Sequence, residues 1–133
     1  MPPWAAAHLA DAPDEEWSLK DFTIVDELFR SGSGGVFKAV LRKKRDKAST
    51  FVLKQKRCRD LFKRREAMNE VTLLTRLKHP HIVECFGSFW DNVRGSLYVV
   101  LEYATGGDLH SLIQTRQNYF PEQWVWLGMR QIC

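Results

Sequence analysis

Short apolar segments separated by polar turns occupy most of the first hundred residues, and this pattern predicts β-strands. Glycine and serine fill residues 31–35, and the basic block 42–47 is too polar for a protein core, so both are predicted connections. Turn-forming residues at 91–95 mark a third connection. The strands are expected at residues 22–29, 36–41, 50–55, 82–88 and 97–102.

A helical pattern interrupts the strands between residues 62 and 78. Ala67, Val71 and Leu74 recur at helical spacing, and Leu73 widens the apolar stripe. The pair His79-Pro80 should end this helix, because a residue before proline resists the helical region.

Two further helices are expected after a flexible link at Thr105-Gly106-Gly107. The first covers residues 108–114, with Asp108 as its N-cap. The second starts with Pro121 in its first turn. Its apolar residues are Trp124, Val125, Leu127, Met129 and Ile132.

These elements predict an α+β fold in which a five-stranded antiparallel sheet packs against one helix. The hydrophobic share of 44% includes eight Phe and five Trp, so the chain can bury a core. Residues 1–18, rich in Ala, Pro and acidic side chains, are expected to form a mobile leader.

Charge is distributed unevenly along the chain. Residues 1–27 carry seven acidic side chains against one lysine, whereas residues 38–65 carry thirteen Lys and Arg against two Asp. The basic block could bind nucleic acid or an acidic partner, but it lacks the interleaved aromatics of single-strand binders. We therefore expect a solvated hairpin and helix start, and no nucleic-acid partner.

The cysteines indicate neither a disulfide framework nor a metal site. Cys58, Cys85 and Cys133 are odd in number, far apart and without a C-x-x-C pair. Reduced thiols are typical of the cytosol or nucleus. The sequence has no apolar run of about 18 residues, so no membrane span is expected.

A glycine cluster and a strand-end lysine could together hold phosphates. The glycines at 32–35 allow backbone N–H groups to approach phosphate oxygens, although taken alone they are better explained by a glycine-rich hairpin turn. Lys54 follows the apolar Phe51-Val52-Leu53, and strand alternation places it on the face of Val52. By itself Lys54 could also be an ordinary strand-end lysine.

Glu70 is the expected partner of Lys54. It shares a helix face with Leu73, Leu74 and Leu77, where a carboxylate is costly unless it is paired. Glu66, one turn earlier, is the competing candidate, and a solvated position for Glu70 is the simpler alternative. We favour Glu70 because it lies nearer the middle of the stripe.

Three blocks of sequence resemble protein kinases. Val-Leu-Lys at 52–54 resembles the V-A-I-K motif. The run from Glu66 to Val83 is similar to the regulatory helix and its exit, and the run from Leu97 to Leu109 to the strand, hinge and following helix. The Glu-Ala-Met-Asn-Glu-Val and Tyr-Ala-x-Gly-Gly-Asp-Leu runs most resemble the NIMA-related serine/threonine kinases. The resemblance covers about residues 20–133.

This resemblance implies a kinase N-lobe and hinge over residues 19–104 and the start of a C-lobe over 105–133. Lys54 would hold the α- and β-phosphates of ATP and pair with Glu70. Leu74 and Cys85 would belong to the hydrophobic spine. The remaining residues implied to contact ATP are Ser31, Gly32 and Gly34 at the phosphates, Val36, Val52, the gatekeeper Leu101, Glu102 and Ala104 around adenine, and Asp108 near ribose.

The sequence departs from the family pattern in two ways. When Val36 anchors the G-x-G-x-x-G-x-V motif, Gly34 matches the third glycine, whereas Phe29 and Ser31 replace the others. The 133 residues also contain neither H-R-D-x-x-x-x-N nor D-F-G, which supply the catalytic base and the Mg²⁺ ligands. No metal-binding residue is therefore predicted, and this polypeptide alone is expected to be an inactive part of a kinase.

The resemblance implies ATP and a protein substrate as partners, Mg²⁺ as the cofactor of the intact family, and phosphoryl transfer to Ser or Thr. The alternative is a non-catalytic binding or regulatory fragment, or a pseudokinase-like interaction module. A cytoplasmic location is expected, with nuclear and microtubule- or cilium-associated locations as alternatives. The apolar helix at 120–133 is expected to promote self-association.

Overall fold

A computed structural model describes residues 17–42, 50–116 and 119–132. The chain forms two compact units, the first reaching to Tyr103 and the second beginning at Ala104. The predicted leader lies outside the described residues except for Trp17 and Ser18. Trp17 packs edge-on against Phe22, with ring centroids 6.0 Å apart, so a residue before the expected Leu19 already packs against the first strand.

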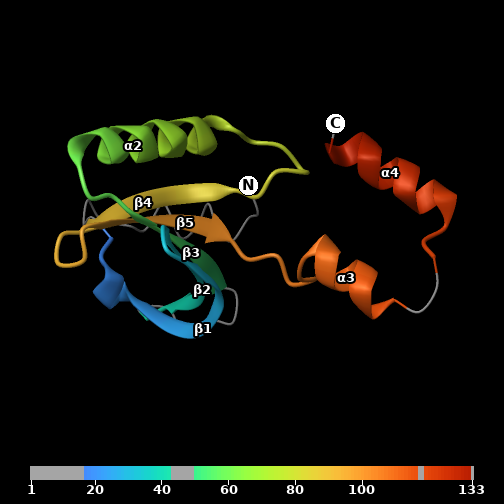
Figure 1. The fold of residues 1–133 in the computed structure, drawn as a ribbon, viewed down its shortest axis with the longest axis horizontal. Helices are drawn as coiled ribbons and strands as arrows, with labels where there is room; N and C mark the ends of the chain where they lie inside the picture. Colours follow the sequence, from blue (N-terminus) through green and yellow to red (C-terminus); the bar gives the residue numbers. More distant parts are fainter. Residues whose placement is uncertain (1–16, 43–49, 117–118, 133) are drawn as a thin grey trace. The chain divides into compact units, whose positions relative to one another are not determined.

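The first unit is a five-stranded antiparallel sheet with one α-helix beside it (Figure 1). The predicted element order is confirmed over the described residues. Along the chain the elements are the short 3₁₀ helix η1 (Leu19–Asp21), β1 (Phe22–Ser31), β2 (Gly34–Leu41), β3 (Thr50–Arg57), α2 (Leu61–Arg76), β4 (Cys85–Asp91) and β5 (Ser96–Glu102). In the sheet the strands follow the order β1-β2-β3-β5-β4.

Several boundaries differ from the sequence-based expectations. The third strand continues through Lys56 to Arg57 instead of stopping at Gln55. The fourth strand starts at Cys85, because Ile82 donates its backbone N–H to His79 O in a turn. The helix begins after an unpredicted N-cap, Asp60, whose side chain accepts a hydrogen bond from Lys63 N at 2.8 Å.

The sheet has an apolar cluster on each of its two faces. One cluster lies on the face opposite α2 and contains Phe22, Ala39, Phe51, Leu53, Phe89, Tyr98 and Val100. The other lies under α2 and contains Cys58, Ala67, Val71, Cys85, Leu97 and Val99, with Leu74, Trp90 and Leu101 packed against it. In β5 the side chains alternate between these clusters, which explains why its first five residues are all buried.

The buried stripe of α2 is narrower than expected. Ala67 and Val71 are its buried residues, and Leu74 is partly buried. The expectation that Leu73 and Leu77 belong to the same apolar face is wrong, since they are 63% and 47% exposed. Glu70 therefore lies beside the buried stripe, at its edge.

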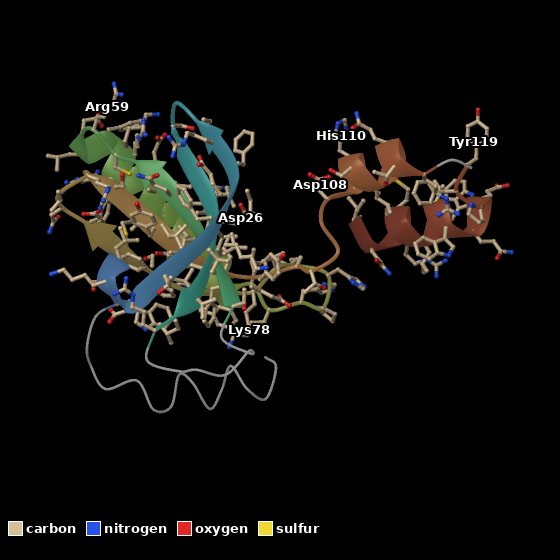
Figure 2. The ribbon with its side chains drawn as sticks, turned by 90° about the horizontal axis from the view of Figure 1, so that it is seen from below. Asp26, Arg59, Lys78, Asp108, His110 and Tyr119 are labelled. Carbon is tan, nitrogen blue, oxygen red and sulfur yellow. The ribbon has the colours of Figure 1, made fainter. Side chains whose placement is uncertain are left out.

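The second unit contains two helices, α3 (Leu109–Thr115) and α4 (Glu122–Ile132). Asp108 caps α3 as expected, and its Oδ1 accepts a hydrogen bond from Ser111 N at 2.6 Å (Figure 2). Pro121 lies just before α4, where its carbonyl accepts from the N–H groups of Trp124 and Val125. No helix in the described part of the chain combines the length and apolar character needed to cross a bilayer.

Candidate functional site

Two lysines of β3 project from the face of the sheet that carries α2. The register places Lys54 opposite Val99 and Lys56 opposite Leu97, and both of these apolar residues are buried under the helix. Opposed residues of antiparallel strands share a face, and so do alternate residues of one strand. Both ammonium groups therefore rise from an apolar floor toward α2.

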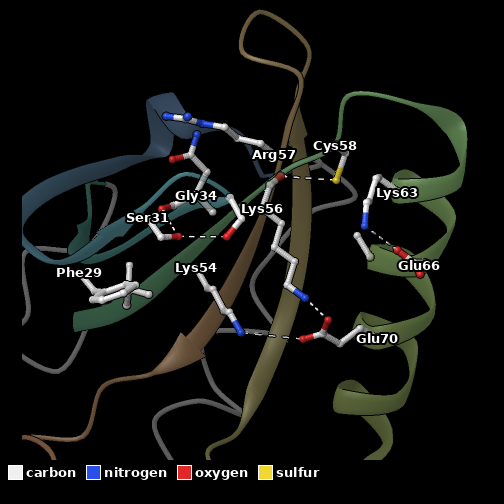
Figure 3. Close-up of a pocket in the computed structure, with 15 residues that line it drawn as sticks. Phe29, Ser31, Gly34, Lys54, Lys56, Arg57, Cys58, Lys63, Glu66 and Glu70 are labelled. Atoms are coloured by element: carbon white, nitrogen blue, oxygen red, sulfur yellow. Dashed lines mark hydrogen bonds and ion pairs between the residues drawn. The ribbon is translucent and has the colours of Figure 1, made fainter.

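Glu70 approaches these lysines from α2. Its Oε1 lies 3.9 Å from Lys54 Nζ, and its Oε2 accepts a hydrogen bond from Lys56 Nζ (Figure 3). The competing carboxylate, Glu66, instead pairs with Lys63 on its own helix at 3.4 Å. The structure thus brings together the two residues that the sequence paired, and adds a third.

Lys56 is the site residue that sequence reasoning missed. Its side chain is 22% exposed, compared with 45% for Lys54. Burial is the main cause that lowers the pKa of Lys56, and the nearby positive charge of Lys54 lowers it further. Strand alternation would have revealed Lys56, had the predicted strand continued one residue further.

The β1–β2 turn forms another wall of the site. Gly32 and Ser33 connect the strands, and the paired residues Ser31 and Gly34 close the turn. The Ser31 hydroxyl donates to Gly34 O at 3.2 Å, and Arg57 N donates to Ser33 O at 2.9 Å. The turn is therefore tied to the end of the lysine-bearing strand.

Gly34 is required by close backbone packing. Its φ is +147°, and a Cβ atom built there would lie 1.9 Å from the carbonyl oxygen of Gln55. By contrast, a Cβ atom on Gly32 would meet nothing within 4 Å. Of these two glycines, the one that matches the family motif is also the one that lets the hairpin lie against β3.

A pocket of about 420 Å³ lies between the turn, β3 and α2. It unites five of the predicted site residues, Ser31, Gly34, Val36, Lys54 and Glu70. Phe29, which replaces the first glycine of the motif, also lines it. Four cationic side chains, Lys54, Lys56, Arg57 and Lys63, face two carboxylates, Glu66 and Glu70, so the lining carries a net positive charge suited to an anion.

The other predicted contacts lie outside this pocket. Val52 and Leu101 are opposite each other in β3 and β5, on the same face as the lysines. Glu102 ends β5, where its N–H donates to Glu84 O at 2.9 Å and its side chain accepts from Glu84 N at 3.2 Å. Ala104 and Asp108 belong to the second unit. Gly32 stands at the tip of the turn.

The cysteines and acidic groups of the described residues form no metal site. No group of three or more His, Cys, Asp or Glu side chains there could hold a metal ion. Cys58 and Cys85 are free and buried in the cluster under α2, with Leu74 packed against the same cluster. Burial raises the pKa of the Cys85 thiol, which disfavours its reactive thiolate form.

The sequence matches known protein kinases over most of its length. A family model described as protein kinase domain matches residues 22–133. Nek1 of Mus musculus, a serine/threonine-protein kinase, is 37% identical over 110 residues, which are 80% of this chain and 9% of that protein. Nek5 of Mus musculus, also a serine/threonine-protein kinase, is 42% identical over 103 residues, or 76% of this chain and 16% of that protein.

A relative outside that group gives a similar match. The serine/threonine-protein kinase Aurora-1 of Arabidopsis thaliana is 31% identical over 114 residues, covering 86% of this chain and 38% of that protein. The chain thus spans well under half the length of each of these relatives.

Proposed function

Because the chain belongs to the protein kinase family, we propose that it provides the ATP-holding part of a serine/threonine protein kinase. The observation that carries this proposal is the pocket in which Lys54 and Glu70 meet below the Ser31–Gly34 turn. ATP combines charged phosphates with a flat apolar base, and the pocket offers cations and a backbone turn for the phosphates.

The residues of the proposed ATP site, inside and beside the pocket, have separate roles. Lys54, the more exposed lysine, neutralises phosphate charge, while Glu70 orients the lysine. Val36, Val52 and Leu101 lie on neighbouring strands of the same face and form the apolar surface for adenine. Glu102, at the end of β5, contacts the edge of adenine in this proposal. Mg²⁺, when bound to ATP, supplies further charge neutralisation.

The intact protein is proposed to transfer the γ-phosphoryl group of ATP to Ser or Thr of a protein substrate. The H-R-D and D-F-G motifs are not present in these 133 residues. We therefore expect the 133-residue polypeptide alone to bind nucleotide without catalysing transfer. A radiolabel assay with ATP and a mixed Ser/Thr substrate checks this, and labelled protein above the no-enzyme background would contradict it.

Calorimetric titration with Mg²⁺-ATP tests the binding site. We expect weak binding, because the pocket lining comes from the first unit alone and Phe29 stands where the family motif has its first glycine. Lys54→Ala should reduce the affinity at least about tenfold, the size of one lost charge-assisted hydrogen bond. Lys20→Ala is the matched control, since it removes the same charge from an exposed position outside the pocket. Tight binding that survives Lys54→Ala would overturn the assignment of Lys54.

A binding module is the second candidate function, and the surface of α4 is the observation that favours it. Its large apolar residues are exposed, including Trp124 at 63% and Trp126 at 66%. Such a surface suits contact with another protein. The genomic sequence that follows the Cys133 codon distinguishes the two: H-R-D and D-F-G motifs there support the enzyme, and a stop codon with a stable product of about 15 kDa supports the module.

A further inference from the structure

The two lysines that share Glu70 are not equivalent. Lys56 donates a hydrogen bond to Glu70 Oε2, whereas Lys54 Nζ lies 3.9 Å from Oε1, beyond hydrogen-bonding distance. Lys56 is also the more enclosed of the two, at 22% exposure against 45%. Its contact with Glu70 is therefore the stronger connection between the helix and the strand.

This connection adds to the narrow apolar contact that α2 makes with the sheet. Its buried side chains are the small Ala67 and the medium-sized Val71. The larger apolar residues Leu61, Phe62 and Leu73 point into solvent, with exposures of 83%, 69% and 63%. Leu74 is only partly buried against the same cluster, so a polar contact at the edge of this narrow stripe should add to the attachment of the helix.

The charges also favour different roles for the two lysines. Two ammonium groups beside one carboxylate leave an unneutralised positive charge, and their repulsion contributes to the lowered pKa of Lys56. An anion that binds Lys54 relieves this repulsion, while Glu70 keeps Lys56 as its counter-ion. Binding at Lys54 therefore does not require Glu70 to give up its main partner.

We infer that Lys56 is a positioning residue that fixes Glu70 and α2 against β3, so that Lys54 beside Glu70 is available to engage the phosphates of a nucleotide. The second half of this inference rests on the proposed function. The first half depends only on the contacts among Lys54, Lys56 and Glu70, and it can be tested without nucleotide.

Hydrogen–deuterium exchange of the 133-residue chain tests the anchoring role, with peptides from α2 as the readout and peptides from β5 as the internal reference. Lys56→Met keeps an apolar stem but removes the ammonium, so exchange in α2 should rise about three- to tenfold. Lys54→Met, the matched control, should change it by less than about twofold. Lys56→Arg should restore protection, because arginine keeps the charge and the donors.

The outcomes separate an electrostatic anchor from simple packing. If α2 in Lys56→Met is as protected as in the wild type, only the apolar stem of Lys56 matters and the inference is overturned. Faster α2 exchange in Lys54→Met alone would also overturn it. If Lys56→Met also exposes β5, Lys56→Arg decides: wild-type protection supports the anchor, and the same unfolding contradicts it.

Mg²⁺-ATP titration of the same variants tests the division of roles. We expect Lys54→Met to lose nucleotide while α2 remains protected, and Lys56→Met to retain measurable binding with a less protected helix. Equal loss of binding in both variants would contradict the division. If the unmodified chain binds no nucleotide, the proposed function fails, while the exchange comparison still decides whether Lys56 anchors the helix.

Discussion

Replacing Gly34 with alanine would place a methyl group where the β1–β2 hairpin lies against β3. The added carbon would approach the Gln55 carbonyl oxygen to 1.9 Å and its carbonyl carbon to 2.8 Å, and neither belongs to a flexible side chain. The backbone must therefore shift. The φ of +147° is also one that alanine rarely adopts.

The expected loss of stability is about 2 to 4 kcal/mol, which combines backbone strain with overpacking. For a unit of this size, such a loss lowers the melting temperature by about 10 to 20 °C. The hydrogen bond from Arg57 N to Ser33 O should weaken as the turn moves away. Urea unfolding followed by tryptophan fluorescence measures the free energy of unfolding.

Gly32→Ala is the matched control, because it makes the same change two residues away in the same turn. A Cβ atom there meets nothing within 4 Å, and Gly32 is not among the described glycines with positive φ. We expect a change within about 0.5 kcal/mol. Equal destabilisation by the two substitutions would refute the reasoning, since turn flexibility and not close packing would then explain Gly34.

Two further predictions concern the β4–β5 turn and α4. The Arg94 side chain donates a hydrogen bond to Asp91 at 2.8 Å and holds the pKa of that carboxyl below its usual value. The resulting contribution to stability is present above the unfolded pKa of about 4. It is lost as the pH falls through the pKa of the folded state. Asp91→Ala should flatten the stability curve below about pH 4 in urea titrations at several pH values, and an unchanged acid limb would contradict the assignment. The exposed Trp124, Trp126 and Ile132 of α4 should drive self-association of the 133-residue chain, which deletion of residues 120–133 should reduce. Sedimentation velocity that shows a clean monomer at tens of micromolar would count against it.

The strands could be predicted because their residues carry the signal locally. The strand β5, whose first five residues are buried, is recognisable in the sequence as an apolar run. The end of β3 was harder, because Lys56 and Arg57 are polar and look like the start of a loop. They remain in the strand because they pair with Leu97 and Ser96 of β5, which follow about 40 residues later. Local composition carries no information about such pairing.

The candidate site was predictable only in part, for a related reason. Helical spacing indicates which residues share a face, so Glu70 could be assigned to the sheet side of α2. It does not indicate how the helix is rotated against the sheet. The contacts of α2 with β4 and β5 bury Ala67 and Val71, and this rotation leaves Leu73 exposed and brings Glu70 to Lys56. Only the assembled unit determines that pairing.

The lysines and the carboxylate of the pocket lie on elements that differ in how rigidly they are held. Lys54 and Lys56 belong to an inner strand that is hydrogen-bonded on both sides, whereas Glu70 belongs to a helix held by Ala67, Val71 and the partly buried Leu74. When the pocket fluctuates, Glu70 should therefore move, while Lys54 and Lys56 stay in place. A spin label or fluorophore that reports this motion should be placed on the solvent side of α2. A second label on β3 would serve as the fixed reference.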